Sequence, residues 1–519
     1  MAGDSKGLRN DEIAEALSTR SAWPAADGSV EWIQTHISHV FLVGDRVFKL
    51  RKDVELPFLD FSTRRLRNAD CVRELALNRR LSPTVYLGIA QVLCRGDSVR
   101  IGPVEEFPKD DESEHVVVMR RLPLGGDALS MLQKEELEPR HLDAIAERVQ
   151  KFHASHGLGS PAPWSAAAWF ERIAEPVHAC LTSLAESNLV SDERIEALKS
   201  RTHERLTSLR ARFEARRLEG RAVDGHGDLH LDHVWFEKAA DEPLVIDCLE
   251  FSDDLRRIDA ASEVAFLSMD LCYRNRADLA NVLLNAYASR ADDFGLFAVV
   301  DFFAGYRALV RAKVAALAAL QTTIAEEQRA KARLSVENHL ALAEDFLAPP
   351  AQASLIVICG TVGSGKSTVA RDLSLTGQGI AIASDRVRKA MAGISATTRT
   401  AAKSDEGIYR PDQTERVYQG LLERAVPILE GGRTAILDAS FSKRAQRDAA
   451  QAWAAERGIP IRLIEVRCDP IVAEARLRER ERIGLDPSDA GPDFLAVSQA
   501  RFEAPDEWPA ESRQIIWSS

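Results

Sequence analysis

Two short stretches of the chain combine residue types that handle phosphoryl groups, carboxylates or metal ions. The first reads Gly360-Thr361-Val362-Gly363-Ser364-Gly365-Lys366-Ser367. The second reads His226-Gly227-Asp228-Leu229-His230-Leu231-Asp232-His233, with Val245-Ile246-Asp247 following it. Glycines let backbone N–H groups wrap a phosphate, whereas closely spaced carboxylates and imidazoles serve acid–base chemistry or hold a metal ion.

The first stretch is a complete phosphate-binding P-loop. Such a loop needs a strand before it and a helix after it, and the sequence predicts both, at 355–359 and 367–373. Lys366 would reach the β- and γ-phosphates of ATP, and Ser367 would give a hydroxyl to Mg²⁺. The residues predicted to hold the nucleotide are Gly360, Gly363, Ser364, Gly365, Lys366, Ser367 and Thr368. The alternative is a glycine-rich turn that binds no ligand.

Residues downstream indicate what this P-loop serves. Asp385 and Arg388 follow the second predicted strand and resemble the acceptor side of small P-loop kinases, a group that includes gluconate, shikimate and polynucleotide kinases and zeta-type toxins. The resemblance implies that Asp385 orients or deprotonates an acceptor hydroxyl and that Arg388 holds substrate. The alternative is a helix-capping Asp followed by solvated basic residues. Asp438 ends an apolar strand in the manner of a Walker B aspartate, which supports Mg²⁺.

An arginine-rich helix lies near the C-terminus. Residues 476–482 alternate Arg with Leu or Glu and resemble the lid of the small kinases, where arginines close over the phosphates. Arg476 and Arg480 are the favoured lid residues because they lie four positions apart. A solvated face held by salt bridges remains the alternative.

Residues 30–345 resemble kinases of the aminoglycoside phosphotransferase type, and the loop from His226 to His230 carries the strongest part of that resemblance. It implies that Asp228 is the catalytic base and that Asp247, on the following strand, holds Mg²⁺. Lys49 would contact the α- and β-phosphates, and Glu74 would pair with that lysine. The segment from Met119 to Leu122 would be the hinge that holds adenine by backbone groups.

Nearly the whole chain resembles bacterial fusions of an aminoglycoside phosphotransferase with an ATP-binding P-loop domain. The fold expected is therefore an α+β protein-kinase-like domain followed by an α/β domain with a parallel sheet. The expected activity is transfer of the γ-phosphoryl group of ATP to a hydroxyl of a small molecule, such as a sugar, cyclitol or nucleoside. "Aminoglycoside" is here a label of the fold and does not identify the acceptor.

His233 departs from the family pattern. The family usually has Asn five residues after the catalytic Asp, as a magnesium ligand, and Mg²⁺ binds imidazole poorly. The first region would therefore be slow, differently metallated or inactive, acting as a nucleotide-sensing or regulatory module. Two other interpretations stay open: a transition-metal hydrolase site, and a purely structural role for His226 and His230.

The elements that must position these residues follow from hydrophobic periodicity. A β-hairpin is predicted at 40–50, a helix at 64–81, and short strands at 85–94, 99–102 and 115–119, the second of them ended by Pro103. Helices are predicted at 139–156, 165–187, 191–217 and through 259–346. Strands at 379–383, 434–437 and 461–466 alternate with helices, which favours a parallel sheet covered on both faces.

The domain boundaries predicted from this pattern divide the chain into four parts. These are an N-terminal segment 1–29, a kinase-like domain 30–346, a Pro-containing linker 347–353 and a P-loop domain 354–519. Within the kinase-like domain, the N-lobe would cover 30–120 and the C-lobe 121–346.

Bulk composition narrows the function classes. The 519 residues carry a net charge of -12, which argues against a nucleic-acid partner and disfavours the alternative of a polynucleotide or zeta-toxin-like kinase. Neither a membrane span nor a secretory signal is expected, and 7 scattered cysteines indicate a reduced, cytoplasmic protein. The sequence determines neither the acceptor nor the oligomeric state.

Overall fold

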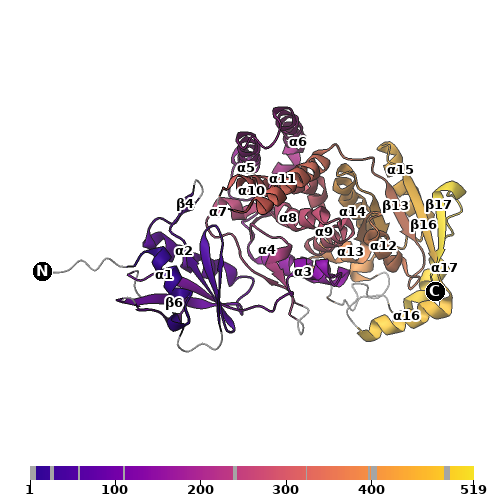
Figure 1. Ribbon diagram of the computed structural model, residues 1–519. Coiled ribbons are helices and arrows are strands. Elements are labelled where there is room, and N and C mark those ends of the chain that lie inside the picture. Colours follow the sequence, from indigo (N-terminus) through magenta and orange to yellow (C-terminus); the bar gives the residue numbers. More distant parts are fainter. Residues whose placement is uncertain are drawn as a thin grey trace. The chain divides into compact units, whose positions relative to one another are not determined.

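The computed structural model of the protein describes residues 8–23, 29–56, 59–96, 98–108, 112–237, 242–322, 324–394, 398, 406–483, 491 and 493–518. The chain forms two compact units (Figure 1). Unit 1 comprises Met1–Leu137, Phe152–His156 and Val223–Ile258, and unit 2 comprises Glu138–Lys151, Gly157–Ala222 and Asp259–Ser519. No helix within the described ranges is long and apolar enough to cross a membrane.

A six-stranded antiparallel sheet is the centre of unit 1, with strand order β1-β2-β3-β8-β6-β7. The strands are β1 (Val30–Gln34), β2 (Ser38–Val43), β3 (Arg46–Arg51), β6 (Tyr86–Arg95), β7 (Ser98–Glu105) and β8 (His115–Arg120). A two-residue turn joins β2 to β3, so the predicted hairpin is confirmed. The short strands β4 (Glu55–Leu56) and β5 (Leu59–Asp60) pair with each other.

Helices cover this sheet because their apolar residues recur every three or four positions. Helix α2 (Arg64–Asn78) begins at Thr63, whose hydroxyl accepts a hydrogen bond from the backbone N–H of Leu66. Helix α1 (Asn10–Leu17) places Ile13 and Leu17 in the same core as strands β2 and β3. The N-terminal segment therefore contributes to the core of unit 1, although its residues 1–7 and 24–28 lie outside the described ranges.

The prediction that Pro103 ends its strand is wrong. Strand β7 continues through Pro103 to Glu105. It is an edge strand, and its pairing with β6 shifts register between Ala90 and Val92. Proline is tolerated there because an edge strand has one unpaired side and a bulge leaves a residue out of the ladder.

Short elements follow the loop of unit 1 that carries Asp228. They are η2 (Leu231–His233), β10 (Val234–Trp235) and β11 (Leu244–Val245), and β10 pairs antiparallel with β11. The prediction placed Asp247 on the second strand, but β11 ends two residues earlier and Asp247 has φ +61. Aspartate tolerates this left-handed conformation better than most residues. The backbone at Asp247 therefore does not continue the strand.

Unit 2 contains a helical part and the P-loop half. The helices are α4 (Pro139–Ser155), α5 (Ala166–Glu186), α6 (Asp192–Leu218), α8 (Ala260–Tyr273), α9 (Ala277–Ala291), α10 (Val300–Leu320) and α11 (Glu326–Leu347), of which only the last four residues of α4 belong to unit 1. Ser165 and Ser191 cap α5 and α6 with their hydroxyls. The helices predicted at 139–217 and 259–346 are confirmed.

The P-loop half is built on a five-stranded parallel sheet with order β14-β15-β13-β16-β17. The strands are β13 (Leu355–Cys359), β14 (Ile380–Ala383), β15 (Ala435–Asp438), β16 (Ile461–Arg467) and β17 (Arg513–Trp517), and the last was not predicted. Ile356 and Ile358 pack with Ala370 of α12 (Lys366–Leu375), so the buried Leu355 and Val357 face the opposite side. Helices α14 (Pro411–Glu430) and α15 (Arg444–Glu456) also contact the sheet (Figure 1).

The P-loop half packs against the helical part of unit 2. Arg424 of α14 donates to Asp292, the residue that ends α9, at 2.7 Å. Arg433, before β15, donates to Asp301 of α10 at 2.8 Å. These ion pairs fix the position of the P-loop half against the helices of unit 2.

The predicted linker follows α11, with Pro349 and Pro350 after the helix end. The domain boundaries at 346 and 354 stay a prediction.

Candidate active sites

Lys49 is the centre of the first candidate site, in unit 1. It projects from β3, and its Nζ lies 2.9 Å from Glu74 Oε1 on α2 and 2.9 Å from Asp247 Oδ1. The predicted pairing of Lys49 with Glu74 is confirmed. Burial lowers the pKa of Lys49, but Asp247 and Glu74 outweigh it and hold the pKa above its ordinary value. The lysine is therefore a fixed cation that joins the sheet, the helix and the loop carrying Asp247.

Arg51 is a second buried cation that sequence reasoning missed. Its Nε lies 2.7 Å from Asp70 Oδ2, and its Nη2 contacts Glu74 Oε2 at 2.7 Å and also Glu250 Oε1. The Arg51 side chain is 1% exposed. Arg51 thus shares Glu74 with Lys49, which fixes the glutamate from two sides. The sequence did carry a signal for Arg51, because it lies two residues after Lys49 and residues two apart on a strand face the same side.

The loop around Asp228 is held by hydrogen bonds of His226. Its Nε2 donates to the Ile246 carbonyl at 2.8 Å, and its Nδ1 accepts from the Asp228 backbone N–H at 3.3 Å. Burial lowers the pKa of His226 to about 3, so the ring is neutral. The structural role considered for His226 is confirmed. This ring connects the Asp228 loop with the segment that carries Asp247.

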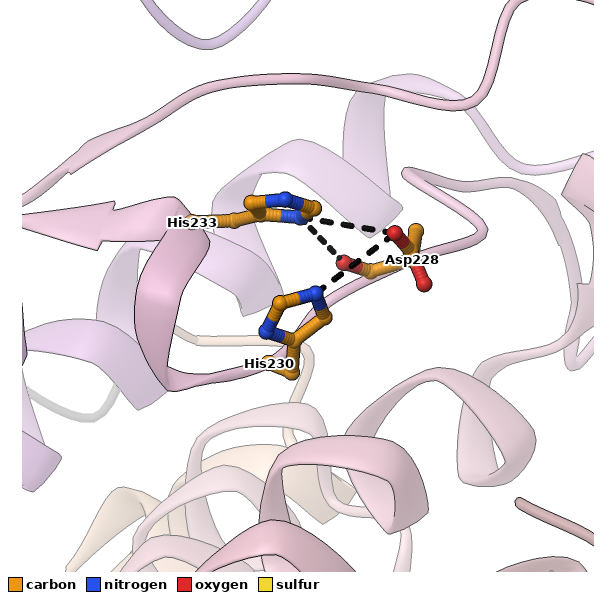
Figure 2. Close-up of side chains that lie close together, drawn as sticks. All are labelled: Asp228, His230 and His233. Atoms are coloured by element: carbon orange, nitrogen blue, oxygen red, sulfur yellow. Dashed lines mark hydrogen bonds and ion pairs between the residues drawn. The ribbon is translucent and has the colours of Figure 1, made fainter. Parts of the chain in front are cut away.

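Two further imidazoles lie beside the Asp228 carboxylate, as Figure 2 shows. His230 Nε2 and His233 Nδ1 are each 3.6 Å from Asp228 Oδ2, and the two rings are 3.9 Å apart between centroids. Burial opposes ionisation of Asp228, but the neighbouring imidazoles hold its pKa below the ordinary value. The side chain of Asp228 is therefore an ionised carboxylate, the form that can accept a proton.

The donor atoms at this site fit a divalent ion. One ligand atom each from Asp228, His230 and His233 lie within 4.8 Å of one another. The second oxygen of Asp247 is 3.6 Å from His233 Nε2. Burial holds the pKa of Asp247 up, but Lys49 and then His233 bring it below its ordinary value, so both aspartates are available as anionic ligands.

Met119 lies within β8, between β3 and β6, in register with Val47 and Tyr86. Its side chain packs in the core cluster that also includes Ile246, the residue before Asp247. Because both neighbouring strands pair with β8, the chain leaves the sheet only after Arg120. The role of Met119 as an adenine-binding hinge residue stays a prediction.

The second candidate site lies at the carboxyl ends of the parallel strands, where open α/β sheets bind ligands. The P-loop follows β13, and α12 begins directly at Lys366. Gly363 has φ +78, and a Cβ there would lie 2.9 Å from the Ala473 carbonyl oxygen, so only glycine fits. Lys366 Nζ donates to the Thr361 carbonyl at 2.7 Å, which folds the lysine over the loop.

The remaining P-loop residues differ in their surroundings. Ser367 and Thr368 are exposed in the first turn of α12, whereas Ser364 is buried and its Oγ has no hydrogen-bond partner within the described ranges. Gly360 and Gly365 also have positive φ, of +148 and +94. The predicted loop is thus present with its glycines in conformations that other residues rarely adopt.

Three predicted residues meet beside this loop. Asp438 ends β15, paired in register with Ile358 and with Ala383, and Asp385 follows Ala383 in the first turn of α13 (Ser384–Met391). Burial lowers the pKa of Lys366, and the negative charges of Asp438 and Asp385 oppose that effect. Burial also raises the pKa of Asp438. The charges of Lys366, Asp385 and Asp438 therefore interact at one sheet edge.

Arg388 is buried one turn after Asp385. Its Nη1 donates to the Ile408 carbonyl at 2.8 Å and to Thr414 Oγ1 at 3.2 Å, and its guanidinium lies over the Tyr409 ring at 4.8 Å. Its Nε has no hydrogen-bond partner within the described ranges. Substrate contact by Arg388 stays a prediction.

The arginines of α16 (Pro470–Ile483) divide into two sets. Arg478 and Arg482 form exposed pairs with Glu474 and Glu479, as the solvated-face interpretation predicts. Arg476 instead donates to Ser518 Oγ at 2.9 Å and lies beside Gly365. The charge of Arg480 acts on Lys366 and Asp438. Arg476 thus lies beside the P-loop and the charge of Arg480 reaches it, and closure of either residue over phosphates stays a prediction.

Together, the folds and sites define a class of protein in which a kinase-like phosphotransferase region precedes a P-loop region. A model of the Phosphotransferase enzyme family matches residues 59–302, and a model of an AAA domain matches residues 355–505. Uncharacterized proteins of Mycobacterium tuberculosis and Mycobacterium bovis are 32% identical over 490 residues, covering 93% of this chain and 92% of each relative. The chain belongs to the family of these mycobacterial proteins, and the fold class predicted from the sequence is confirmed.

Solved structures with kinase folds are also similar. A choline/ethanolamine kinase family protein from Mesorhizobium loti is 14% identical with a TM-score of 0.35, covering 65% of this chain and 100% of that chain. An ethanolamine kinase of Plasmodium vivax is 12% identical with a TM-score of 0.40, covering 67% and 96%. A gluconokinase from Sinorhizobium meliloti is 18% identical with a TM-score of 0.23, covering 32% and 83%.

Proposed function

We propose that this protein is an ATP-dependent phosphotransferase that transfers the γ-phosphoryl group to a hydroxyl of a small molecule. The observation that carries the proposal is the contact of Lys49 with both Glu74 and Asp247 at 2.9 Å. Kinases of this type require that lysine–glutamate pair and the metal-binding aspartate to be in place together. The contacts of Lys49 with Glu74 and with Asp247 within unit 1 support this arrangement.

In the proposed reaction of this region, the bond between the γ-phosphorus and the ADP oxygen breaks, and a bond to the acceptor oxygen forms. Asp228 takes the hydroxyl proton, a role supported by its ionised carboxylate. Lys49 would bind the α- and β-phosphates. Asp247 would hold a divalent ion, and that ion would neutralise charge at the phosphates.

The P-loop half would perform the same class of reaction with other residues. The N–H groups of the loop and the start of α12 would hold the phosphates, and Lys366 would neutralise them. Ser367 and Asp438 would hold Mg²⁺, and Asp385 would orient the acceptor hydroxyl. The buried hydroxyl of Ser364, which lacks a partner within the described ranges, supports a ligand in the loop.

A phosphorylation screen of a metabolite pool with γ-labelled ATP, read by mass spectrometry, tests the proposal. Asp228→Asn and Asp385→Asn should each lower transfer at their own site by about 10²- to 10⁴-fold. Asp372→Asn, an exposed residue of α12, is the matched control and should keep wild-type transfer. A product whose formation both active-site variants leave unchanged would refute the proposed roles. Labelling of 5′-hydroxyl oligonucleotides in preference to small molecules would refute the acceptor class.

A further inference from the structure

His233 occupies the position where the family resemblance predicts a metal-binding Asn. The imidazole lies in η2, and its side chain is 15% exposed. Its Nδ1 is 2.8 Å from the backbone carbonyl oxygen of Asp228 (Figure 2). A carbonyl oxygen only accepts hydrogen bonds, so Nδ1 carries the proton in this contact. The neutral ring then has its lone pair on Nε2.

The Nε2 atom of His233 faces Asp247. It lies 3.6 Å from Asp247 Oδ2, which is too far for a hydrogen bond. Two ligand atoms that are each about 2.1 Å from one ion stand about 3.0 Å apart at a right angle and about 3.4 Å apart at a tetrahedral angle. The observed 3.6 Å is slightly longer than the tetrahedral separation, so a small approach of the two side chains would place both on one ion.

Both partners are held in this orientation by other groups. Metal-binding histidines commonly donate their second N–H to a backbone carbonyl, as His233 does to Asp228. Asp247 is held by Lys49, 2.9 Å from its Oδ1, and its backbone N–H donates to the Tyr86 hydroxyl at 3.0 Å. Its φ of +61 is sparsely populated by residues other than glycine, and such conformations gather at functional sites.

We propose that His233 Nε2 and Asp247 Oδ2 together bind one divalent transition ion of the Mn²⁺ class, in preference to Mg²⁺. Mg²⁺ takes oxygen ligands and keeps its waters, whereas transition ions accept imidazole readily. The proposal deepens the proposed function and rests on it, because that function places a divalent ion at Asp247. In this proposal, His233 changes which metal ion the site prefers and does not abolish metal binding.

Pulsed electron paramagnetic resonance of the full chain with MnCl₂ tests this directly. An imidazole ligand produces ¹⁴N modulation of the Mn²⁺ spin echo, and ¹⁵N-histidine labelling of the wild type should change that modulation without any substitution. The last histidine of the sequence is His339, so the P-loop half has no imidazole to offer. A nitrogen signal must therefore come from the region before residue 340.

His233→Asn should abolish the ¹⁴N modulation and reduce the affinity ratio of Mn²⁺ to Mg²⁺ by about 10- to 100-fold. His203→Asn, an exposed residue of α6, is the matched control and should keep both. Modulation that persists in His233→Asn, or that is absent from Mn²⁺-saturated wild type, would overturn the proposal. If the nitrogen signal is absent while phosphoryl transfer still depends on Asp228, only the metal inference is wrong. If the nitrogen signal is present while transfer does not depend on Asp228, the proposed function is wrong and the metal inference stands.

Discussion

Replacing Arg51 by methionine should destabilise unit 1, and the loss should depend on pH. Arg51 and Lys49 are the two cations of a buried cluster whose carboxylates belong to Asp70, Glu74, Asp247 and Glu250. Methionine keeps much of the side-chain volume and removes the charge. Lys49 would then be the only one of these two cations left beside four carboxylates.

The size of the effect follows from burial. Removing one partner of a buried ion pair costs about 3–5 kcal/mol, because the remaining charge stays buried without compensation. Asp70, Glu74 and Glu250 are all buried, so the loss should reach this range at pH 8. An exposed arginine gives a matched control: Arg46→Met, on the same strand, should change stability by about 0.5 kcal/mol or less.

Glu250 sets the sign of the pH dependence. Burial raises its pKa from 4.5 to about 7, and Arg51 opposes that rise. The folded state therefore holds this proton more tightly than the unfolded state does. The associated stability is complete below pH 4.5 and is lost as pH rises through 7, by about 3 kcal/mol. Without Arg51 the carboxyl would stay protonated to higher pH, so Arg51→Met should be nearer to wild type at pH 5 than at pH 8.

Hydrogen exchange measured by mass spectrometry on peptides from β2, β3 and α2 reports the free energy of opening within unit 1. It avoids treating a chain with two compact units as a single two-state transition. A loss below about 1 kcal/mol at pH 8, or a larger loss at pH 5 than at pH 8, would show that Arg51 does not compensate the buried carboxylates in the way described.

Two further predictions concern the two sites separately. Gly363→Ala should weaken nucleotide binding by the P-loop at least about 10-fold in calorimetry, because the new Cβ meets the Ala473 carbonyl at 2.9 Å. Gly458→Ala, with φ +63 and open space around it, is the control, and equal binding by both variants would contradict the argument. For His226, burial puts the pKa at about 3, below its ordinary 6.5, so stability is complete above pH 6.5 and is lost as pH falls. Hydrogen exchange should show the advantage of wild type over His226→Asn shrinking by about 2 kcal/mol between pH 7 and pH 5, and a growing advantage would contradict it.

Much of the fold could be predicted from the sequence because hydrophobic spacing decides it locally. The hairpin at β2 and β3 and the helices from α4 to α11 follow directly from two-residue and three-to-four-residue periodicity. The prediction that Pro103 ends its strand was wrong because an edge strand tolerates proline. The edge position of β7 is a property of the whole sheet and cannot be seen in the local sequence. Strand β17 was missed because it is short and only partly buried.

The candidate sites were predictable where residue order carries the information. The order of Lys49, Glu74, Asp228 and Asp247 predicted the ion pair of Lys49 with Glu74, whereas the ion pair of Lys49 with Asp247 was not predicted. Arg51 was missed because its three carboxylate partners come together only in the folded unit. The ring state of His233 likewise depends on a backbone carbonyl five residues away in sequence, which spacing alone does not orient.

The central claim is that one chain holds two separate nucleotide sites, one at Lys49 and one at Lys366. Calorimetric titration with a non-hydrolysable ATP analogue, with Mg²⁺ and Mn²⁺ present, measures the number of sites per chain. Wild type should bind two nucleotides, Lys49→Met and Lys366→Ala one each, and the double variant none. A single site in wild type, or loss of both sites in either single variant, would contradict the account.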